Sequence, residues 1–300
     1  MADSNIEGNT TRTFNDAINA SQAKLVEIFA GLSIFLSIAS SVGNFVILSA
    51  LYRVSSIYPP TKLFFRCLAA TDLCVGLIVQ PLYTTSIMSY AMEMNENVSY
   101  YTGKICATSS TILCGVSLLT TTVISVDRLL ALLLGLRYRT FVTLRRARFV
   151  ITCIWIMMAT IAMIGLWKAD VFNKVTSVMT VLSLITSMSS YAKIYLTLRK
   201  HQTQIQKDST HGQPYVVGFA VNIARYRKTV SSILWVQLAL LACYAPYGIV
   251  AGMKINTLAC YLVSSALVHL NSTLNPILYC WKIREVRKAV KDTIQQLHSC

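Results

Sequence analysis

The stretch STLNPILYCW, residues 272–281, decides the fold of this 300-residue chain. It ends an apolar run, Ile255–Trp281, that contains no Asp, Glu, Lys or Arg, yet it places Asn275 directly before Pro276. Proline inside a helix removes a backbone hydrogen bond and kinks the helix axis. An amide in hydrocarbon needs a hydrogen-bond partner or water. The stretch therefore predicts a kinked membrane helix whose polar face lies against a hydrated interior.

The composition of the whole chain is that of a membrane protein. Hydrophobic residues make up 54% of the chain, charged residues 13%, and the mean hydropathy is +0.54. Each of its long apolar runs reaches the roughly 20 residues that a helix needs to cross a bilayer. In chain order the seven runs are Leu25–Tyr52, Leu63–Ser89, Ile105–Leu134, Phe149–Trp167, Val175–Leu198, Thr229–Met253 and Ile255–Trp281. We expect an all-α membrane protein, a seven-transmembrane helix bundle over residues 25–281.

The net charge of +15 is concentrated in basic segments that follow the third, fifth and seventh runs. The positive-inside rule places these segments in the cytoplasm, so the charge does not indicate a nucleic-acid partner. Seven spans then put the N-terminus outside and the C-terminus inside, in a multi-pass protein of the plasma membrane. Asn-X-Ser/Thr sequons at Asn9, Asn19 and Asn97 fall on the predicted outer side, where they predict glycosylation.

Both ends of the chain are polar. Residues 1–24 predict an uncleaved, flexible extracellular tail. Residues 282–300 predict an amphipathic helix on the inner membrane surface and a short cytoplasmic tail, because apolar side chains share one helix face and lysines and arginines the other. The terminal Cys300 can carry palmitate beside this basic segment.

Asp72 is the most informative polar residue, because it lies well inside the second run. A carboxylate at that depth needs a cation, a proton or a polar cage. Polar side chains at comparable depth on other runs are Asn44, Ser117, Asn271, Ser272 and Asn275. Their oxygen atoms suit a small hard cation such as sodium, as an allosteric modulator. A structural hydrogen-bond network around a protonated Asp72 is the alternative, and composition favours neither.

A second polar pair, Asp127 and Arg128, falls at the inner end of the third run. It is either an ordinary interfacial charge pair or a latch that opens when the bundle rearranges. Tyr191 and Tyr279 fall near the same depth and could meet Arg128 once it swings.

Two of the nine cysteines, Cys106 and Cys260, fall near the predicted outer surface, where a disulfide can form. Their separation in space is not fixed by the sequence, so a disulfide and two free thiols both stay open.

Short motifs on successive runs, taken together, resemble the rhodopsin-like (class A) G-protein-coupled receptors over essentially the full chain. The motifs are GNFVI at 43–47, LAATD at 68–72, DRL at 127–129, Trp155, CYAP at 243–246 and NPILY at 275–279. The resemblance implies a sodium and water pocket around Asp72. It also implies an activation switch that opens a cytoplasmic cleft for a heterotrimeric G protein. The switch residues are Asp127, Arg128, Tyr191, Tyr244, Pro246, Pro276 and Tyr279.

The chain departs from that family at several switch positions. Asp-Arg-Leu stands for the usual Asp-Arg-Tyr, and Tyr244 stands for the usual tryptophan. The inner end of the sixth run, residues 225–228, has no acid to hold Arg128. We therefore expect a weak inactive-state lock and some basal activity. The family's disulfide cysteine is expected near Gly103, and the nearest cysteine is Cys106.

Features of two receptor groups are combined in this chain. The short segment 168–174 and the fifth run without proline resemble melanocortin receptors, whereas the seventh run resembles adenosine and cannabinoid receptors. The resemblance places a ligand pocket between the third, sixth and seventh runs. Its residues are Ser110, Thr111, Cys114, Tyr244, Tyr247 and His269. Few charges favour a small neutral, polar or lipid-like ligand, including a purine-like one, although His269 could equally be a core histidine.

Other functions remain as alternatives. A melanocortin-like peptide receptor is one, and an ion-pathway protein built on Asp72 is another, although no inverted repeat is evident. A seven-helix membrane hydrolase would need a cluster of metal ligands. Three of the four histidines fall in cytoplasmic segments, so we expect no enzyme activity. The expected partners are a heterotrimeric G protein that modulates cAMP, a small-molecule, lipid or peptide ligand, and membrane lipids.

Overall fold

The computed structural model describes residues 2–55, 57–92, 96–209, 238–250, 252–253, 257–282, 287–288 and 290. Side chains are described for these residues except 2–19, 90, 96, 201–202, 204–209 and 279–282. Within this part of the chain all regular structure is helical, which agrees with the predicted all-α class.

The first five predicted runs all form long helices. They are α1 (Ala2–Arg53), α2 (Pro59–Cys74) with its continuation α3 (Gln80–Ala91), α4 (Glu96–Leu134), α6 (Leu144–Trp167) and α7 (Ala169–Ser209). The five candidate spans among the described residues, long and apolar enough to cross a membrane, come from these helices. The short elements η2 (Gly135–Arg137) and α5 (Tyr138–Phe141) join α4 to α6.

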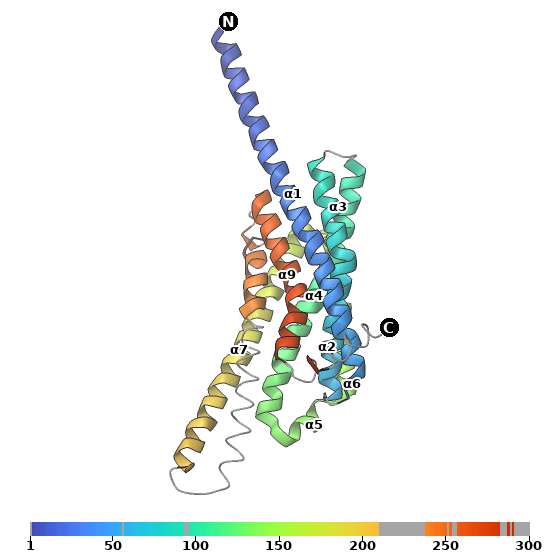
Figure 1. The fold of residues 1–300 in the computed structure, drawn as a ribbon, viewed down its shortest axis with the longest axis vertical. Coiled ribbons are helices and arrows are strands. Elements are labelled where there is room, and N and C mark those ends of the chain that lie inside the picture. The colour runs from blue at the N-terminus through green and yellow to red at the C-terminus, as the bar shows by residue number, and fades with distance from the viewer. Residues whose placement is uncertain are drawn as a thin grey trace.

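The sixth and seventh runs complete the bundle. A helix over Leu238–Val250 is the described part of the sixth run, and α9 (Leu258–Lys282) is the seventh. Pro276 lies inside α9, as predicted. His269 and the asparagines of this helix are buried, so its polar face is turned into the protein. The seven-helix bundle is thereby confirmed (Figure 1).

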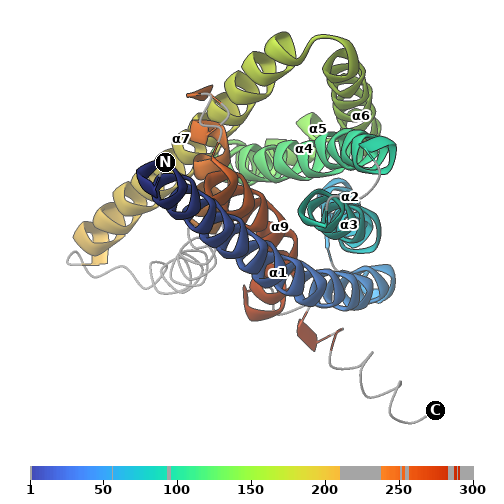
Figure 2. The same ribbon diagram turned by 90° about the horizontal axis from the view of Figure 1, so that it is seen from above.

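The helix α4 occupies the centre of the bundle (Figure 2). It packs against α2, α3, α6 and α7, while α1 packs against α2, α3 and α9. Large apolar side chains of the outer helices are exposed, for example Phe35 on α1 and Ile185 on α7. An apolar exterior is what a bilayer requires of the protein that it surrounds.

The ends of several helices differ from the predicted boundaries. Helix α1 begins at Ala2, so the segment predicted as a tail is helical. A single residue, Lys168, separates α6 from α7, which makes the predicted short connection 168–174 shorter still. Helix α7 continues to Ser209, eleven residues beyond the end of the fifth predicted run at Leu198. The predicted amphipathic helix and Cys300 lie almost entirely outside the described residues.

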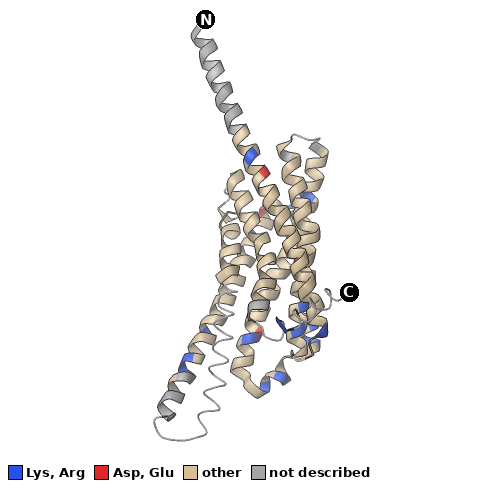
Figure 3. Ribbon diagram, in the orientation of Figure 1, with Lys and Arg blue, Asp and Glu red and all other residues tan. Residues whose placement is uncertain are grey.

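Basic residues gather at one end of the bundle, around α5 and the first turn of α6 (Figure 3). Arg139, Arg145 and Arg148 are exposed there. Because the predicted cytoplasmic segment 137–148 lies at this end, it defines what we call the basic end of the molecule.

A five-residue π-helix, η1 (Val75–Val79), joins α2 to α3 just before Pro81. Proline lacks the N–H of a regular helix, and a wider turn accommodates it. Along this junction α1 lies so close that its serine hydroxyls reach backbone carbonyls. The bonds run from Ser33, Ser37 and Ser40 to the carbonyl oxygens of Gln80, Gly76 and Asp72, over 3.4, 2.6 and 3.0 Å. This serine seam fixes the position of Asp72 relative to α1.

Candidate functional site

The carboxylate of Asp72 is fully buried at the middle of the bundle and is held by three donors. Its Oδ1 accepts hydrogen bonds from the hydroxyls of Ser117, at 2.9 Å, and Ser272, at 2.8 Å. Its Oδ2 accepts one from Nδ2 of Asn275, at 2.7 Å. Helices α2, α4 and α9 therefore meet at a single carboxylate, as the sequence predicted.

Asn44 closes the cage from the side of α1. Its Nδ2 donates to the carbonyl oxygens of Ser40, at 2.9 Å, and Ser272, at 3.0 Å. Gly43 makes this approach feasible, because a Cβ there would lie 3.0 Å from Cγ of Pro276. The proline that marked the opening stretch is thus packed directly against α1.

The six residues of this cage fit a sodium ion in the chemistry of their donors. The set offers one carboxylate together with hydroxyl and amide oxygens, and hard cations prefer oxygen ligands. The buried Oδ1 of Asn44 has no hydrogen-bond partner among the described residues. Since Asn44 contacts Ser272, which itself bonds Asp72, this unpartnered acceptor is a candidate ligand for a cation or its water.

Arg128 lies in a second polar cluster at the basic end. Its Nη2 donates to Oδ2 of Asp127 and to the hydroxyl of Thr61, each at 2.6 Å. The hydroxyl of Tyr138 donates to Oδ1 of Asp127, at 2.6 Å. Asp127 is almost fully buried, and these contacts hold the arginine against α2 and the aspartate against α5. The charge pair predicted from the sequence is present, with two further members.

Thr61 and Tyr138 were not predicted as site residues. Tyr138 lies eleven positions after Asp127, beyond the turn at η2, so no helical spacing relates the two residues. Only the fold of η2 and α5 brings the phenol back to α4. Its ring also packs on Tyr58, with centroids 5.4 Å apart.

Other predicted switch residues are placed differently. Tyr191 on α7 is buried against Leu129 and lies beside Ser125. Pro246 lies in the helix Leu238–Val250. The side chain of Tyr279 and residues 225–228 lie outside the described part of the chain, so their predicted roles stay predictions.

Removing the hydroxyl of Tyr138 should raise basal signalling. In Tyr138→Phe, Asp127 loses one of its hydrogen bonds, and a bond to a charged group is worth roughly 1.5–3 kcal/mol. If only the resting state contains this bond, the active population should rise by about tenfold or more. The measurement is ligand-free G-protein activation at matched surface level. Tyr58→Phe, which removes the hydrogen bond to the carbonyl of Val142, is the control and should leave the signal unchanged.

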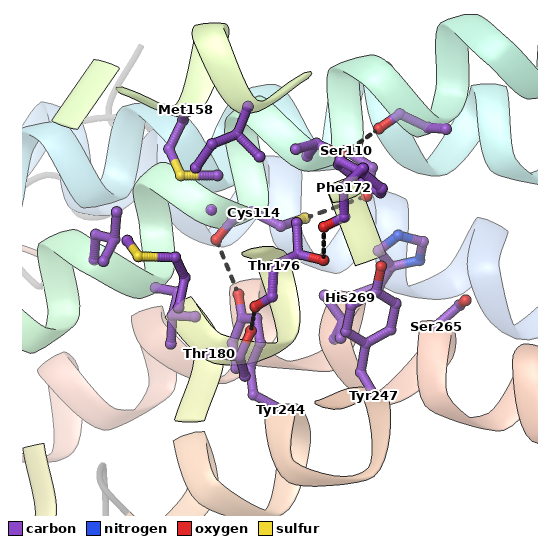
Figure 4. A pocket seen from close by; sticks show the side chains of 18 of the residues that line it. Ser110, Cys114, Met158, Phe172, Thr176, Thr180, Tyr244, Tyr247, Ser265 and His269 are labelled. Carbon is purple, nitrogen blue, oxygen red and sulfur yellow. Dashed lines mark hydrogen bonds between the residues drawn. The ribbon is translucent and has the colours of Figure 1, made fainter. Parts of the chain in front are cut away.

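A cavity of about 190 Å³ lies on the side of the Asp72 cage that faces away from the basic end (Figure 4). Every residue of the predicted ligand pocket lines it. These are Ser110, Thr111, Cys114, Tyr244, Tyr247 and His269. His269 is buried, and its ring meets the ring of Tyr83 edge-on, with centroids 5.0 Å apart.

The cavity also extends between α4, α6 and α7, which the sequence did not predict. Its additional walls include Met158, Phe172, Thr176, Thr180 and Ser183. The lining residues of α7 lie in its first turns, which follow α6 after the single residue Lys168. The sequence did contain a signal for this wall. Thr176, Thr180 and Ser183 are spaced by four and three positions, which places their hydroxyls on one face of a helix.

The cavity wall contains hydroxyl, thiol, thioether and aromatic groups. Among the described residues that line it there is no Asp, Glu, Lys or Arg. A ligand here would be recognised through neutral hydrogen bonds and apolar contact.

Tyr244 connects the cavity with the Asp72 cage. Its ring lines the cavity, and its hydroxyl donates to the carbonyl oxygen of Cys114, at 3.2 Å. The amide of Asn271 lies beside the same hydroxyl. A ligand that displaces this ring therefore acts on the neighbours of Asp72.

Of the two possibilities that the sequence left open for Cys106 and Cys260, the structure has the free thiols. Cys106 instead packs in an apolar cluster with Val26, Tyr83 and Leu262. Its side chain is buried in the bundle rather than exposed at the outer surface. Asn97 is exposed at the start of α4, whereas the side chains of Asn9 and Asn19 lie outside the described residues.

Comparisons with known proteins agree with this architecture. Residues 43–177 match the family model of the 7 transmembrane receptor (rhodopsin family). Melanocortin receptor 4 of Danio rerio is 25% identical, over 86% of this chain and 81% of its own length. Adenosine receptor A2b of Gallus gallus is 24% identical, over 89% and 88%. The Bos taurus A2b receptor is 32% identical, over 43% and 37%.

These relatives are receptors and not enzymes, which removes the hydrolase alternative. The matches cover the spans that hold Asp72, Arg128 and much of the cavity wall. The chain is therefore a rhodopsin-like (class A) G-protein-coupled receptor, distantly related to the melanocortin and adenosine receptors.

Proposed function

We propose that this receptor binds a small neutral, polar or lipid-like ligand in the cavity and thereby changes cAMP through a heterotrimeric G protein. The receptor spans the plasma membrane with its N-terminus outside, so the cavity opens toward the extracellular side. The basic end then faces the cytoplasm. Its exposed arginines suit the acidic surface of a G protein and anionic lipid headgroups.

The observation that carries this proposal is the position of Tyr244. It belongs to the cavity wall through its ring and to the polar centre through its hydroxyl. Its ring is buried, at 4% exposure, so a shift of the ring changes its contacts with its neighbours. A ligand with different affinity for two positions of this ring shifts the bundle between two states.

The lining of the cavity favours this ligand class over the alternative of a basic peptide. A peptide rich in arginine or lysine needs carboxylates, and the described lining residues supply none. Neutral hydroxyls such as Thr176 and Thr180 can instead orient a polar group. Purine-like ligands remain within this class.

The test is the effect of Arg128→Ala on basal and forskolin-elevated cAMP at matched surface level. We expect the wild-type receptor to shift cAMP and Arg128→Ala to abolish the shift, because this guanidinium is the group released from Asp127 on activation. Arg148→Ala, an exposed arginine of the basic end, is the matched control and should signal as the wild type does. Equal signals from the wild type and Arg128→Ala would contradict coupling through this residue.

A further inference from the structure

The part of the cavity between α4, α6 and α7 has an apolar wall that is rich in sulfur. Its apolar lining side chains are Leu119, Met158, Ile161, Phe172 and Met179. All five pack in one apolar cluster, in which Met158 and Ile161 are buried. In Figure 4 Met158 lies well apart from Ser265 and His269, which line the cavity from α9. The cavity therefore has an apolar end at α6 and a polar end at α9.

Gly115 on α4 gives Met158 its place in this wall. A Cβ at Gly115 would lie 2.1 Å from Cε and 3.0 Å from Sδ of Met158, so the thioether lies directly against the backbone of α4. Phe172 is placed in the same way, because a Cβ at Gly165 would lie 2.8 Å from Cδ2 of its ring. Met158 and Phe172 both line the cavity, so a ligand at the apolar end meets a thioether and an aromatic ring.

Two hydroxyls of α7 at this end have already used their donors. Thr176 and Thr180 line the cavity, and they donate to the carbonyl oxygens of Phe172, at 2.9 Å, and Thr176, at 2.8 Å. Toward a ligand they can act only as acceptors. A ligand group at the apolar end is therefore held chiefly by its contacts with carbon and sulfur.

Thioethers and aromatic rings favour an aromatic partner over a saturated one. A methionine sulfur gains from the edge of a ring about 5 Å away, and the three rotatable bonds of methionine let it adjust to that ring. Two aromatic rings gain further from edge-to-face contact. The size also agrees, since an apolar cavity of about 150 Å³ holds benzene, and about 190 Å³ leaves room for one ring with a short polar arm.

We propose that Met158, Phe172 and Met179 form an aryl subsite, which binds the single aromatic ring of the ligand. Gly115 keeps the place of the Met158 thioether open. The neutral polar group of the ligand then lies toward His269, at the polar end. This inference rests on the proposed function, because it takes the cavity to be the ligand site, and it narrows the ligand class to small aromatic compounds.

The test compares two probes, phenethyl alcohol and its ring-saturated analogue cyclohexaneethanol, which share the same polar arm. Binding is followed as the shift of the unfolding midpoint of the receptor in nanodiscs, titrated against the free aqueous concentration of each probe. The wild type should bind phenethyl alcohol about three- to tenfold more tightly. A site that merely removes apolar surface from water would prefer the more hydrophobic saturated ring, so the two interpretations predict opposite orders of affinity.

Met158→Leu tests the sulfur, because leucine keeps the volume and the apolar character of methionine. This variant should reduce the preference for the aromatic probe by about twofold or more. Met157→Leu is the matched control, since Met157 is the neighbouring residue and belongs to the same apolar cluster without lining the cavity. That variant should bind both probes as the wild type does.

Gly115→Ala tests the position of the subsite. The added Cβ takes the place of the Met158 thioether, and overpacking should weaken the binding of phenethyl alcohol by about fivefold or more. Gly103→Ala is the control on the same helix, because its Cβ would meet only Oγ of Ser86, at 3.6 Å. That variant should leave the affinity unchanged.

The outcomes separate the subsite from the function of the receptor. Equal affinity for the two probes, tighter binding of the saturated one or binding of neither overturns the aryl subsite. A preference that is unchanged in both Met158→Leu and Gly115→Ala does the same. The cAMP comparison of wild type and Arg128→Ala uses neither probe, so its failure beside an intact aromatic preference would instead overturn the proposed signalling.

Discussion

Replacing Gly76 with alanine should lower the midpoint of thermal unfolding by roughly 5–10 °C, since overpacking costs about 1–3 kcal/mol and the serine seam is lost with it. A Cβ at this position would lie 2.5 Å from the hydroxyl of Ser41 and 2.9 Å from its backbone nitrogen. The hydroxyl of Ser41 can rotate away from the added Cβ, but its backbone nitrogen is fixed within α1. Helix α1 must therefore move, and the bond from Ser37 to the carbonyl of Gly76 breaks.

Gly31→Ala is the matched control on α1, because no atom lies within 4 Å of the Cβ that it adds. Alanine is a better helix former than glycine, so this variant should be neutral or more stable, by up to about 1 kcal/mol. Differential scanning fluorimetry of both purified variants makes the comparison. Equal midpoints for Gly76→Ala and Gly31→Ala would show that α1 does not pack against η1 as described.

The sequence predicted the Asp72 cage because every member lies within a run that must be helical. Asn275 and Asn271 are four residues apart, and a helix puts such a pair on one face. Asp72 must then find polar partners, and few polar side chains exist at its depth. The restriction to helices in a bilayer leaves little freedom, so burial cost alone identified the cage.

Residues beyond the ends of the helices escaped prediction. Tyr138 reaches Asp127 only because the chain turns at Gly135, the described residue with positive φ, +50°. The walls on α6 and α7 depend on the tight link at Lys168, whose conformation the sequence does not specify. The state of Cys106 and Cys260 stayed open for the same reason, because the sequence does not fix how a helix is rotated about its axis, and in the structure Cys106 lies in the core as a free thiol.

Removing the charge at Asp72 should abolish a stabilising effect of sodium. For the wild type, exchanging choline for sodium should raise the unfolding midpoint by about 3–6 °C at a sodium concentration near ten times Kd. Asp72→Asn has nearly the same shape, but one carboxylate oxygen becomes an NH2 group. That group, with its two donors, replaces the acceptor of the 2.7 Å bond from Asn275 or of the bonds from Ser117 and Ser272. We expect equal midpoints in the two salts for this variant.

The same experiment decides between the two interpretations of the cage. Ser117→Ala keeps the carboxylate and removes one hydroxyl, so a bound cation predicts a reduced but measurable sodium effect. A structural network around a protonated Asp72 predicts no sodium effect in the wild type, since a neutral carboxyl attracts no cation. In that case Asp72→Asn, which also offers a donor and an acceptor, should be tolerated without loss of stability. A bound ion thus predicts a higher unfolding midpoint of the wild type in sodium, whereas the network predicts an unchanged midpoint. The unpartnered Oδ1 of Asn44 favours the ion.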